Sequence, residues 1–527
     1  MRVRNAMAGL TLMLTAACGG SGGGGGGSQQ PPAYSSVSLV QLSQASAFTP
    51  GCDGTTPDGT LYLDTAAEPS IVVNPTNAMN LVAGWQQNRW STGGAQGLSL
   101  AASFDGGSTW TPSNAAFSRC TGGGSGNAGD YARASDLWLT ASPSGVIYAL
   151  SLSFTGDVLA AGSSSAMLVA SSQDGGRSWS TPAALIQDGA QFFDDKGSIT
   201  ADPTDPNHVY VVWDRLTGPA AGPSYLAVTA DGGTTWAAAR SIYDPGAANQ
   251  TLGNQIAVLP DGTLLDFFTE LDTLPGGQTQ ALARLVQSPD HGATWSAPIT
   301  VAELEPVGTS DPRTGQGVRD GSDIFSVSVA PGGVVYVAWQ DGRFSGGAHD
   351  GIALSHSADG GSTWSAPIEV NGDTAAQAFT PTVHVEAGGL ISISYYDLRN
   401  DTFAPFGALL ADAWMVSSSD GSSFREEHLS GPFDMEHAPD SGGLFVGDYE
   451  ALSGAAATLP LYAQTDADSG IRSDTFLAFP PAVAASAAAA ARFRAGEGLA
   501  PLGLAPAVRE RIARHMEQRR VERRTKP

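Results

Sequence analysis

Six related turns recur along this chain, and the clearest of them reads Ser103-Phe104-Asp105-Gly106-Gly107-Ser108-Thr109-Trp110. The Ser and Asp side chains of such a turn can bond nearby backbone amides and close it. The paired glycines allow positive φ where the chain reverses, and the tryptophan buries a large ring beneath the turn. We call this motif the Asp turn. It predicts a tight link between two strands, and nothing in it requires catalysis.

Repetition of the Asp turn predicts the architecture. Successive copies are far enough apart for one four-stranded sheet each, as expected for a chain built from similar units. A ring of such sheets is an all-β fold, the β-propeller, which leaves few strand edges exposed. The aspartates of the five further copies, of which the last is one residue shorter, are Asp174, Asp231, Asp290, Asp359 and Asp420.

A second repeat bears on the number of sheets. Each unit opens with a strand in which an apolar column, facing the sheet interior, alternates with a mostly polar column facing the axis. We place Tyr449 in the apolar column of the last unit and Asp448 in its polar column. Seven blades are favoured, with six as the alternative. The openings fall at Glu68, Asp136, Lys196, Gly253, Ile324, Thr380 and Gly447.

The last unit has no Asp turn, so its outer strand must come from another part of the chain. An N-terminal strand within Ser36–Leu42 would fill this place and close the ring. The propeller is therefore expected to span residues 35–480. Residues 481–527 are alanine-rich at first and basic later, and we expect them to form a tail. That tail is either solvated or docked on anionic lipid or a partner.

The first residues indicate export. Arg2 and Arg4 precede an apolar run that is too short to span a bilayer. The run ends at Cys18, in a stretch that resembles the lipobox of bacterial lipoproteins, whose cysteine is acylated after cleavage. Residues 1–18 would then be a lipoprotein signal peptide, and residues 19–34 a glycine-rich linker to a lipid anchor at the outer membrane or cell surface. The alternative is an ordinary signal peptide with a chance cysteine.

Three further features of the composition predict a disulfide and bear on which ligands the protein can bind. An even pair, Cys52 and Cys120, predicts a disulfide in an exported protein, and two free thiols are the alternative. The net charge of −25 argues against nucleic acid as a partner. His349, His384 and His437 are scattered without metal-ligand spacing, so we expect no metal and no cofactor.

The Asp turns and the strand pattern, from roughly Glu68 to Phe479, resemble the sialidase (neuraminidase) superfamily of Asp-box, or BNR-repeat, propellers. The resemblance implies a sialidase-type propeller and an exo-alpha-sialidase-like glycoside hydrolase. Active members bind the substrate carboxylate with three arginines and use a Tyr–Glu pair as nucleophile and an Asp as acid. Their first unit begins with an Arg-Ile-Pro motif. The matching stretch here, Glu68-Pro69-Ser70-Ile71, contains no arginine, so the first arginine cannot be transferred.

Four arginines are candidate substrate-binding residues. In a propeller the Asp turns lie on one face, and the loops between second and third strands lie on the opposite face, where ligands usually bind. The arginines fall just after second strands, and a guanidinium group matches a carboxylate in geometry. Because they recur in several units, the alternative is a structural role, such as pairing with Asp341 or Asp397. The four are Arg89, Arg215, Arg343 and Arg399.

Three further residues are candidate catalytic groups. Tyr449 is either the nucleophile or a core residue with a bonded hydroxyl group. Glu270 is either an unpaired base or a solvated loop residue, and Asp448 would face the channel beside Tyr449. Each could take part in sugar chemistry, but each also has an ordinary structural explanation.

Two functions follow from these patterns. The first is a surface-tethered glycoside hydrolase that acts on an exo-linked sugar. The alternative is a tethered, non-catalytic propeller that binds a glycan or a protein, and a scaffold role is a third possibility. In the first two cases we expect a glycan or glycoconjugate as partner, a membrane surface reached through the lipid anchor, and a monomeric protein.

Overall fold

The computed structural model describes residues 34, 37–54, 59–218, 221–403, 407–454, 457–466 and 470–481. The predicted signal peptide with Cys18, nearly all of the predicted linker, and the tail from residue 482 onward lie outside these ranges. Within the ranges, no helix is long and apolar enough to cross a membrane. The helical segments described there are η1 (Arg119–Thr121), η2 (Asp401–Phe403) and η3 (Met435–His437).

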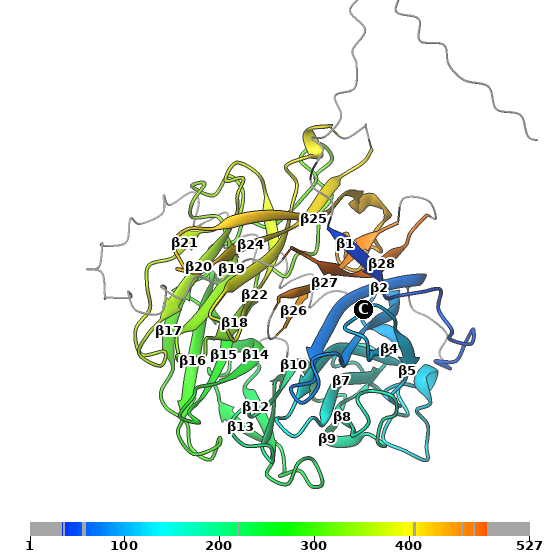
Figure 1. The fold of residues 1–527 in the computed structure, drawn as a ribbon. Helices are drawn as coiled ribbons and strands as arrows, with labels where there is room; N and C mark the ends of the chain where they lie inside the picture. Colours follow the sequence, from blue (N-terminus) through cyan, green and yellow to red (C-terminus); the bar gives the residue numbers. More distant parts are fainter. Residues whose placement is uncertain are drawn as a thin grey trace, which may run out of the picture.

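Strands make up most of the regular structure in the described ranges (Figure 1). The first half of the chain contains β1 (Ser38–Gln41), β2 (Leu61–Val73), β3 (Leu81–Trp90), β4 (Ala95–Ser103), β5 (Thr111–Ser113), β6 (Arg133–Ala141), β7 (Ile147–Thr155), β8 (Ser164–Ser172), β9 (Ala183–Gly189), β10 (Phe193–Ala201), β11 (Val209–Leu216), β12 (Ser224–Thr229) and β13 (Arg240–Tyr243). The second half contains β14 (Gln250–Val258), β15 (Leu264–Thr273), β16 (Thr279–Ser288), β17 (Ile299–Glu303), β18 (Phe325–Val329), β19 (Val335–Asp341), β20 (Gly351–Ser357), β21 (Ile368–Glu369), β22 (Ala378–Val385), β23 (Ile391–Asp397), β24 (Leu410–Ser418), β25 (Arg425–Asp434), β26 (Ala451–Ser453), β27 (Leu459–Thr465) and β28 (Ser473–Phe479).

The strand pairing confirms the all-β class. Four separate sheets each contain four consecutive strands, namely β10–β13, β14–β17, β18–β21 and β22–β25. The other strands, β1–β9 and β26–β28, form one 12-stranded sheet. Single residue pairs, Thr65 with Ser473 and Ala95 with Ala134, hold its parts together. Because these links join the parts, the pairing does not divide this sheet into blades, and the number of blades stays a prediction.

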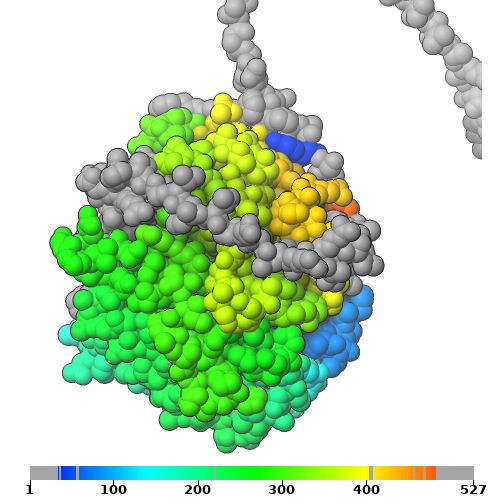
Figure 2. Space-filling model, turned by 90° about the vertical axis from the view of Figure 1, so that its left-hand side faces the viewer, coloured from blue at the N-terminus to red at the C-terminus, as the bar shows by residue number. Residues whose placement is uncertain are grey.

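The sheets close into a ring, which makes the fold a β-propeller. The first strands β2, β6, β10, β14, β18 and β22, together with the start of β26, line one central cavity. Strand β1 pairs antiparallel with β28, with Ser38 opposite Phe479, so an N-terminal strand completes the last sheet as predicted. In Figure 2 the blue residues of the N-terminal part accordingly lie beside orange residues of the C-terminal part.

Apolar side chains pack between neighbouring sheets. In one cluster Phe267 of β15 packs with Phe325 of β18 and Trp339 of β19, and Trp364 of an Asp turn lies against the same cluster. Phe267 and Trp339 have no exposed surface. Burial of these large rings supplies much of the hydrophobic stabilisation that holds successive sheets together.

The Asp turns have the geometry that their sequence predicts. Ser103 Oγ lies 2.9 Å from Asp105 Oδ1, which also accepts a hydrogen bond from the backbone N–H of Thr109 at 2.9 Å. Hydrogen bonds from the side chain and backbone of Thr109 lower the pKa of Asp105 to about 2. The aspartate is therefore committed to closing its own turn.

Asp turns and candidate arginines lie at opposite ends of the sheets. In β11, Val209 pairs with Ala201 and with Thr229, the first residue of an Asp turn, whereas Arg215 at the other end pairs with Asp194 near the start of β10. We call these two sides the Asp-turn face and the arginine face. Each first strand begins at the arginine face and ends at the Asp-turn face.

The predicted opening residues mark a recurring bulge in the first strands. The pairing of β2, β6, β10, β14 and β22 with their neighbours shifts register at this point. A bulge re-aims the side chain that it carries, and glycine is the residue that adopts positive φ without strain. The bulge residues and their φ values are Glu68 (50°), Asp136 (50°), Lys196 (47°), Gly253 (68°) and Thr380 (53°).

Polar residues of the axis-facing column latch most of the first strands to the next one. They donate to, or accept from, the backbone of the neighbouring strand, which satisfies groups that no sheet pairs there. The bonds run Leu139 N to Ser70 Oγ (3.0 Å), Thr200 Oγ1 to Ile256 O (2.8 Å), Gln255 Nε2 to Phe325 O (2.8 Å), Val383 N to Ser326 Oγ (3.1 Å) and Thr382 Oγ1 to Glu450 O (3.1 Å).

The last unit differs from the expected alignment by two residues. In the first unit, Ile71 of the apolar column pairs with the third residue of the unit's second strand. In the last unit, the residue that pairs with the third residue of the second strand is Ala451, so Ala451 is the counterpart of Ile71. The assignment of Tyr449 to the apolar column is therefore wrong, and Glu450 takes the axis-facing place expected for Asp448. Tyr449 and Asp448 lie in an irregular segment before β26, where no proline follows the opening at the usual distance.

Candidate functional site: the axial cavity and its charged end

A cavity of about 220 Å³ occupies the propeller axis. Its wall includes Asp136 and Lys196 at the beginning of the first strands, and it reaches Ser328 and His384, one residue before the ends of β18 and β22. The cavity therefore extends along most of the axis, from the arginine face toward the Asp-turn face.

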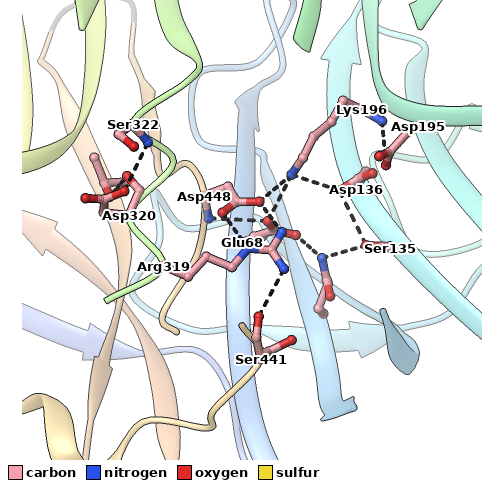
Figure 3. Close-up of polar contacts among 12 residues, drawn as sticks. Glu68, Ser135, Asp136, Asp195, Lys196, Arg319, Asp320, Ser322, Ser441 and Asp448 are labelled. Atoms are coloured by element: carbon pink, nitrogen blue, oxygen red, sulfur yellow. Dashed lines mark hydrogen bonds and ion pairs between the residues drawn. The ribbon is translucent and has the colours of Figure 1, made fainter. Parts of the chain in front are cut away.

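Charged side chains meet at the arginine-face end of this cavity (Figure 3). Lys196 Nζ lies 2.6 Å from Asp448 Oδ2, 3.5 Å from Glu68 Oε1 and 3.7 Å from Asp136 Oδ1. Arg319 donates through Nε to Asp448 Oδ1 at 2.8 Å, and its Nη2 contacts the other oxygen. We call these five residues the axial cluster. They come from β2, β6, β10, the link before β18 and the segment before β26, so the cluster joins five separate parts of the ring at its inner edge.

Opposite charges set the protonation of the axial cluster. Burial raises the pKa of Asp448, but Arg319 and Lys196 outweigh burial, and the pKa lies well below its usual range. Burial lowers the pKa of Lys196, but Asp448, Glu68 and Asp136 raise it on balance. Asp448 is therefore ionised and Lys196 protonated across the physiological range.

Arg89 approaches the axial cluster without entering it. Its Nη1 contacts Gln86, whose amide in turn contacts Glu68, and its Nε donates to Ser441 Oγ at 3.2 Å. The guanidinium carbon lies 4.3 Å from the centre of the Phe445 ring, a cation–π contact. Arg89 is thus buried and fully engaged, and a substrate cannot reach it directly.

The other three candidate arginines do not join Arg89. Arg215 bonds both oxygens of Asp188, at 2.6 and 2.7 Å. Arg343 bonds Asp341 at 2.8 Å. Arg399 bonds Asp397 at 2.6 Å and both oxygens of Glu426 at 2.7 and 2.8 Å. Each of these three arginines forms a local ion pair, which agrees with the structural role considered for them above. The four candidate arginines therefore do not converge on one site that could bind a substrate carboxylate.

Glu270 lies apart from the axial cavity. It is 4% exposed, accepts a hydrogen bond from Tyr243 Oη at 2.7 Å, and its Oε2 lies 3.2 Å from Arg284 Nη1. Glu270 is therefore neither an unpaired base nor a solvated residue, and the sequence pattern missed both partners.

Tyr449 reaches the cavity, although the sequence pattern placed it in the column that faces the sheet interior. Its ring centre lies 5.7 Å from that of Trp138, and Lys196 Nζ lies 5.4 Å from the ring. Its buried hydroxyl group has no hydrogen-bond partner among the described residues. Burial, followed by the nearby carboxyl groups of Glu68 and Asp136, holds the pKa of Tyr449 well above its usual value. The phenol therefore stays protonated at neutral pH.

Glu450 contributes a further carboxyl group to the cavity wall, beside those of Asp136 and Asp448. It accepts a hydrogen bond from Ser394 Oγ at 3.2 Å, and its Oε1 has no partner among the described residues. Burial raises the pKa of Glu450 to about 8. Of the three carboxyl groups in the wall, that of Glu450 is thus protonated at neutral pH and that of Asp448 is ionised, while burial raises the pKa of Asp136.

Sequence reasoning missed five of these residues as site residues, among them Glu450, which directly follows the candidates Asp448 and Tyr449. Glu68, Asp136 and Lys196 were visible only as opening positions, and a run of charged residues at openings is the signal that could have found them. Arg319 comes from the long link before β18, outside both repeats. No group of His, Cys, Asp and Glu side chains that could hold a metal ion occurs in the described ranges.

The predicted cysteine pair lies near the first sheet. Cys52 and Cys120 form a disulfide with their Cα atoms 5.0 Å apart, and 68 residues separate them in the sequence. A disulfide of this kind persists in oxidising compartments.

Comparisons with known proteins give a likeness to solved structures only. No protein-family model matches the chain, and no curated protein matches it. The microbial sialidase Hadza Hz136 is 16% identical over 76% of this chain and 76% of its own, with a TM-score of 0.43. An alpha-L-arabinanase of Penicillium chrysogenum is 15% identical over 68% of this chain and 94% of its own, with a TM-score of 0.44. The NanB sialidase of Streptococcus pneumoniae is 12% identical over 67% of each chain, with a TM-score of 0.41.

Proposed function

We propose that this chain is a glycan-acting propeller whose site is the axial cavity, and that it is a glycoside hydrolase. One observation carries the proposal: two carboxyl groups with opposite protonation states line the same small cavity. Glu450 would act as the acid, and Asp448 as the base or nucleophile.

Glycoside hydrolysis needs this division between two carboxyl groups. The acid must carry a proton to give to the leaving oxygen, and the other group must be ionised to activate water or attack the sugar. Burial keeps Glu450 protonated, and Lys196 with Arg319 keeps Asp448 ionised. The sialidase scheme, with a tyrosine nucleophile, is not favoured here, because the Tyr449 phenol holds its proton and the candidate arginines do not converge.

A panel of fluorogenic glycosides, sialosides included, tests the proposal. We expect turnover of at least one exo-linked substrate, lost in Glu450→Gln and in Asp448→Asn. Glu427→Gln is the matched control, because Glu427 pairs with the exposed Arg425 at the surface, away from the cavity wall. Circular dichroism checks that each variant is folded. Turnover that survives both cavity variants would show that the chemistry lies elsewhere.

A non-catalytic glycan- or protein-binding propeller is the second candidate. The observation that favours it is the complete pairing of Asp448, whose two oxygens are bonded by Lys196 and Arg319. A carboxylate held in this way is a weaker nucleophile. Saturable binding on a glycan array without turnover of any glycoside would favour this candidate over hydrolysis.

The proposal includes attachment to the cell envelope through acylated Cys18. The lipobox-like sequence around Cys18 and the disulfide that suits an oxidising compartment support it. Labelling of growing cells with a fatty-acid analogue should mark the protein, and Cys18→Ala should abolish the label. A label that persists in this variant would contradict acylation at Cys18.

A further inference from the structure

The two ends of the axial cavity differ in how they are covered. At the arginine face, the axial cluster is itself covered by the segment 444–446, in which Leu444, Phe445 and Val446 are at most 5% exposed. Leu444 exchanges backbone hydrogen bonds of 3.0 Å with Gly317 and Arg319, which lie in the link before β18. Two chain segments, paired with each other, therefore cover most of this end, and the Arg319 side chain keeps 22% of its surface exposed.

This covering is bonded to the ring beneath it. Val446 O accepts from the backbone N–H of Glu68 at 3.4 Å, and Ser441 Oγ donates to Trp90 O at 3.1 Å. Phe445 lies between two guanidinium groups, with the guanidinium carbons of Arg89 and Arg319 at 4.3 and 4.6 Å from its ring centre. A ligand that entered from the arginine face would have to break all of these contacts.

The opposite end is lined by residues with partial exposure. Ser328, His384 and Leu452 belong to the cavity wall near the Asp-turn face, and each is half-buried rather than buried. At the charged end, by contrast, Asp136 and Lys196 are 3% and 8% exposed. Exposure thus increases along the wall toward the Asp-turn face.

We propose that the axial cavity is a blind pocket entered from the Asp-turn face, and that it takes one terminal sugar unit. The proposal deepens the proposed function, on which its substrate class rests, and places substrate entry on the side opposite to the candidate arginines. A cavity of about 220 Å³ is smaller than the roughly 300–1,000 Å³ of most ligand pockets, so it admits a single small unit and excludes the interior of a chain.

The wall suits a sugar ring. Trp138 is half-buried and presents an aromatic ring beside that of Tyr449, at an angle of 43° between the planes. Such rings supply an apolar surface, while the unpartnered Tyr449 hydroxyl group and Glu450 Oε1 can bond hydroxyl groups of a sugar. A unit that enters from the Asp-turn face would meet these groups before it reached the axial cluster.

Labelling of an introduced cysteine tests the entrance without needing activity. Ser326 lies in the cavity wall between the two ends, and Ser326→Cys would place a thiol there. We expect a small methanethiosulfonate to label this variant in the folded protein, above the background of the unsubstituted protein. Adding Ser328→Trp should slow labelling by about tenfold or more, because a closed cavity reacts only through local opening.

Ala348→Trp is the matched control, since Ala348 is exposed in the β19–β20 loop on the arginine face. It should leave the labelling rate unchanged. Where Ser328→Trp lowers the yield of folded protein, Leu452→Trp replaces it at the same end. Absence of labelling, slowing by Ala348→Trp, or no slowing by either entrance variant would overturn the proposal. If labelling follows the prediction while no glycoside is turned over, the proposed entrance is supported and the proposed hydrolase activity is contradicted.

Discussion

Lys196 Nζ lies 2.6 Å from Asp448 Oδ2 and joins strand β10 to the segment that precedes β26. Their side chains are 7% and 2% exposed, so water screens this ion pair very little. The two residues are far apart in the sequence and belong to different units of the ring. Their contact means that the axial cluster stabilises the closed ring of the propeller and is also part of the candidate site.

The first prediction concerns the contribution of the axial cluster to stability. Lys196→Met should lower the free energy of unfolding by about 3–5 kcal/mol, because removing one partner leaves buried carboxylates uncompensated. Arg425→Met is the control: its side chain is 64% exposed beside Glu427, and such surface pairs contribute about 0–1 kcal/mol. Urea denaturation measures both. A Lys196 variant as stable as the control would show that the cluster does not hold the ring.

A second prediction concerns the latches between first strands. Ser70→Ala removes the acceptor of the backbone N–H of Leu139, a buried residue, and should cost roughly 1–3 kcal/mol. Ser362→Ala removes a hydroxyl group that bonds Asp359 O on an exposed Asp turn, and should cost less. Equal effects of the two substitutions on thermal stability would contradict a latching role for Ser70.

The third prediction is the pH dependence of stability. Burial raises the pKa of Asp194 to about 7, that of Asp397 to about 7 and that of Glu450 to about 8. For such groups the folded state binds protons more tightly than the unfolded state, so the stabilisation is complete below the unfolded pKa and is lost as pH rises through the folded pKa. The melting temperature should therefore fall as pH rises from about 5 to about 8.

A neutral replacement checks the cause of this dependence. Asp194→Asn keeps an oxygen that can accept from Trp213 Nε1, which lies 2.8 Å from Asp194 Oδ1, but it cannot ionise. Its melting temperature should vary less between these pH values than that of the unsubstituted protein. Below pH 4 the opposite trend should appear, because Asp448, with its lowered pKa, then loses its charge.

The fourth prediction concerns the disulfide. Replacement of Cys52 and Cys120 by alanine should destabilise the protein by roughly 4 kcal/mol, since the bridge closes a long loop and restricts the unfolded chain. A reducing agent should lower the melting temperature of the unsubstituted protein and leave that of the double variant unchanged. Equal sensitivity of both proteins to the reducing agent would point to another cause.

The repeats made the fold predictable, because the Asp turn and the strand alternation are local patterns that recur in nearly every unit. The N-terminal strand that closes the ring was predictable because the last unit lacks an outer strand of its own. The last unit was misaligned by two residues because neither repeat extends into the segment around Tyr449. At the usual distance from this opening stands Gly454 rather than a proline, so the sequence alone did not fix the register there.

The candidate site was less predictable, because its contacts link residues that are far apart in the chain. Asp448 and Tyr449 were recognised, but Arg319 belongs to no repeat, and the pairing of Arg215 with Asp188 depends on the packing of neighbouring sheets. Glu450 became visible only through its burial on the axis. Periodicity predicts which face of a strand a residue occupies, but not which distant charge it meets.

The antiparallel pairing of β1 with β28 places Ser38 opposite Phe479. The chain thus enters and leaves the ring at the same point. A circular permutant that joins these two strands through a short peptide, and is cut instead at an exposed Asp turn, would turn the pairing of β1 with β28 into one continuous hairpin. The order in which the units follow one another along the gene is therefore less constrained than the order in which they stand around the axis.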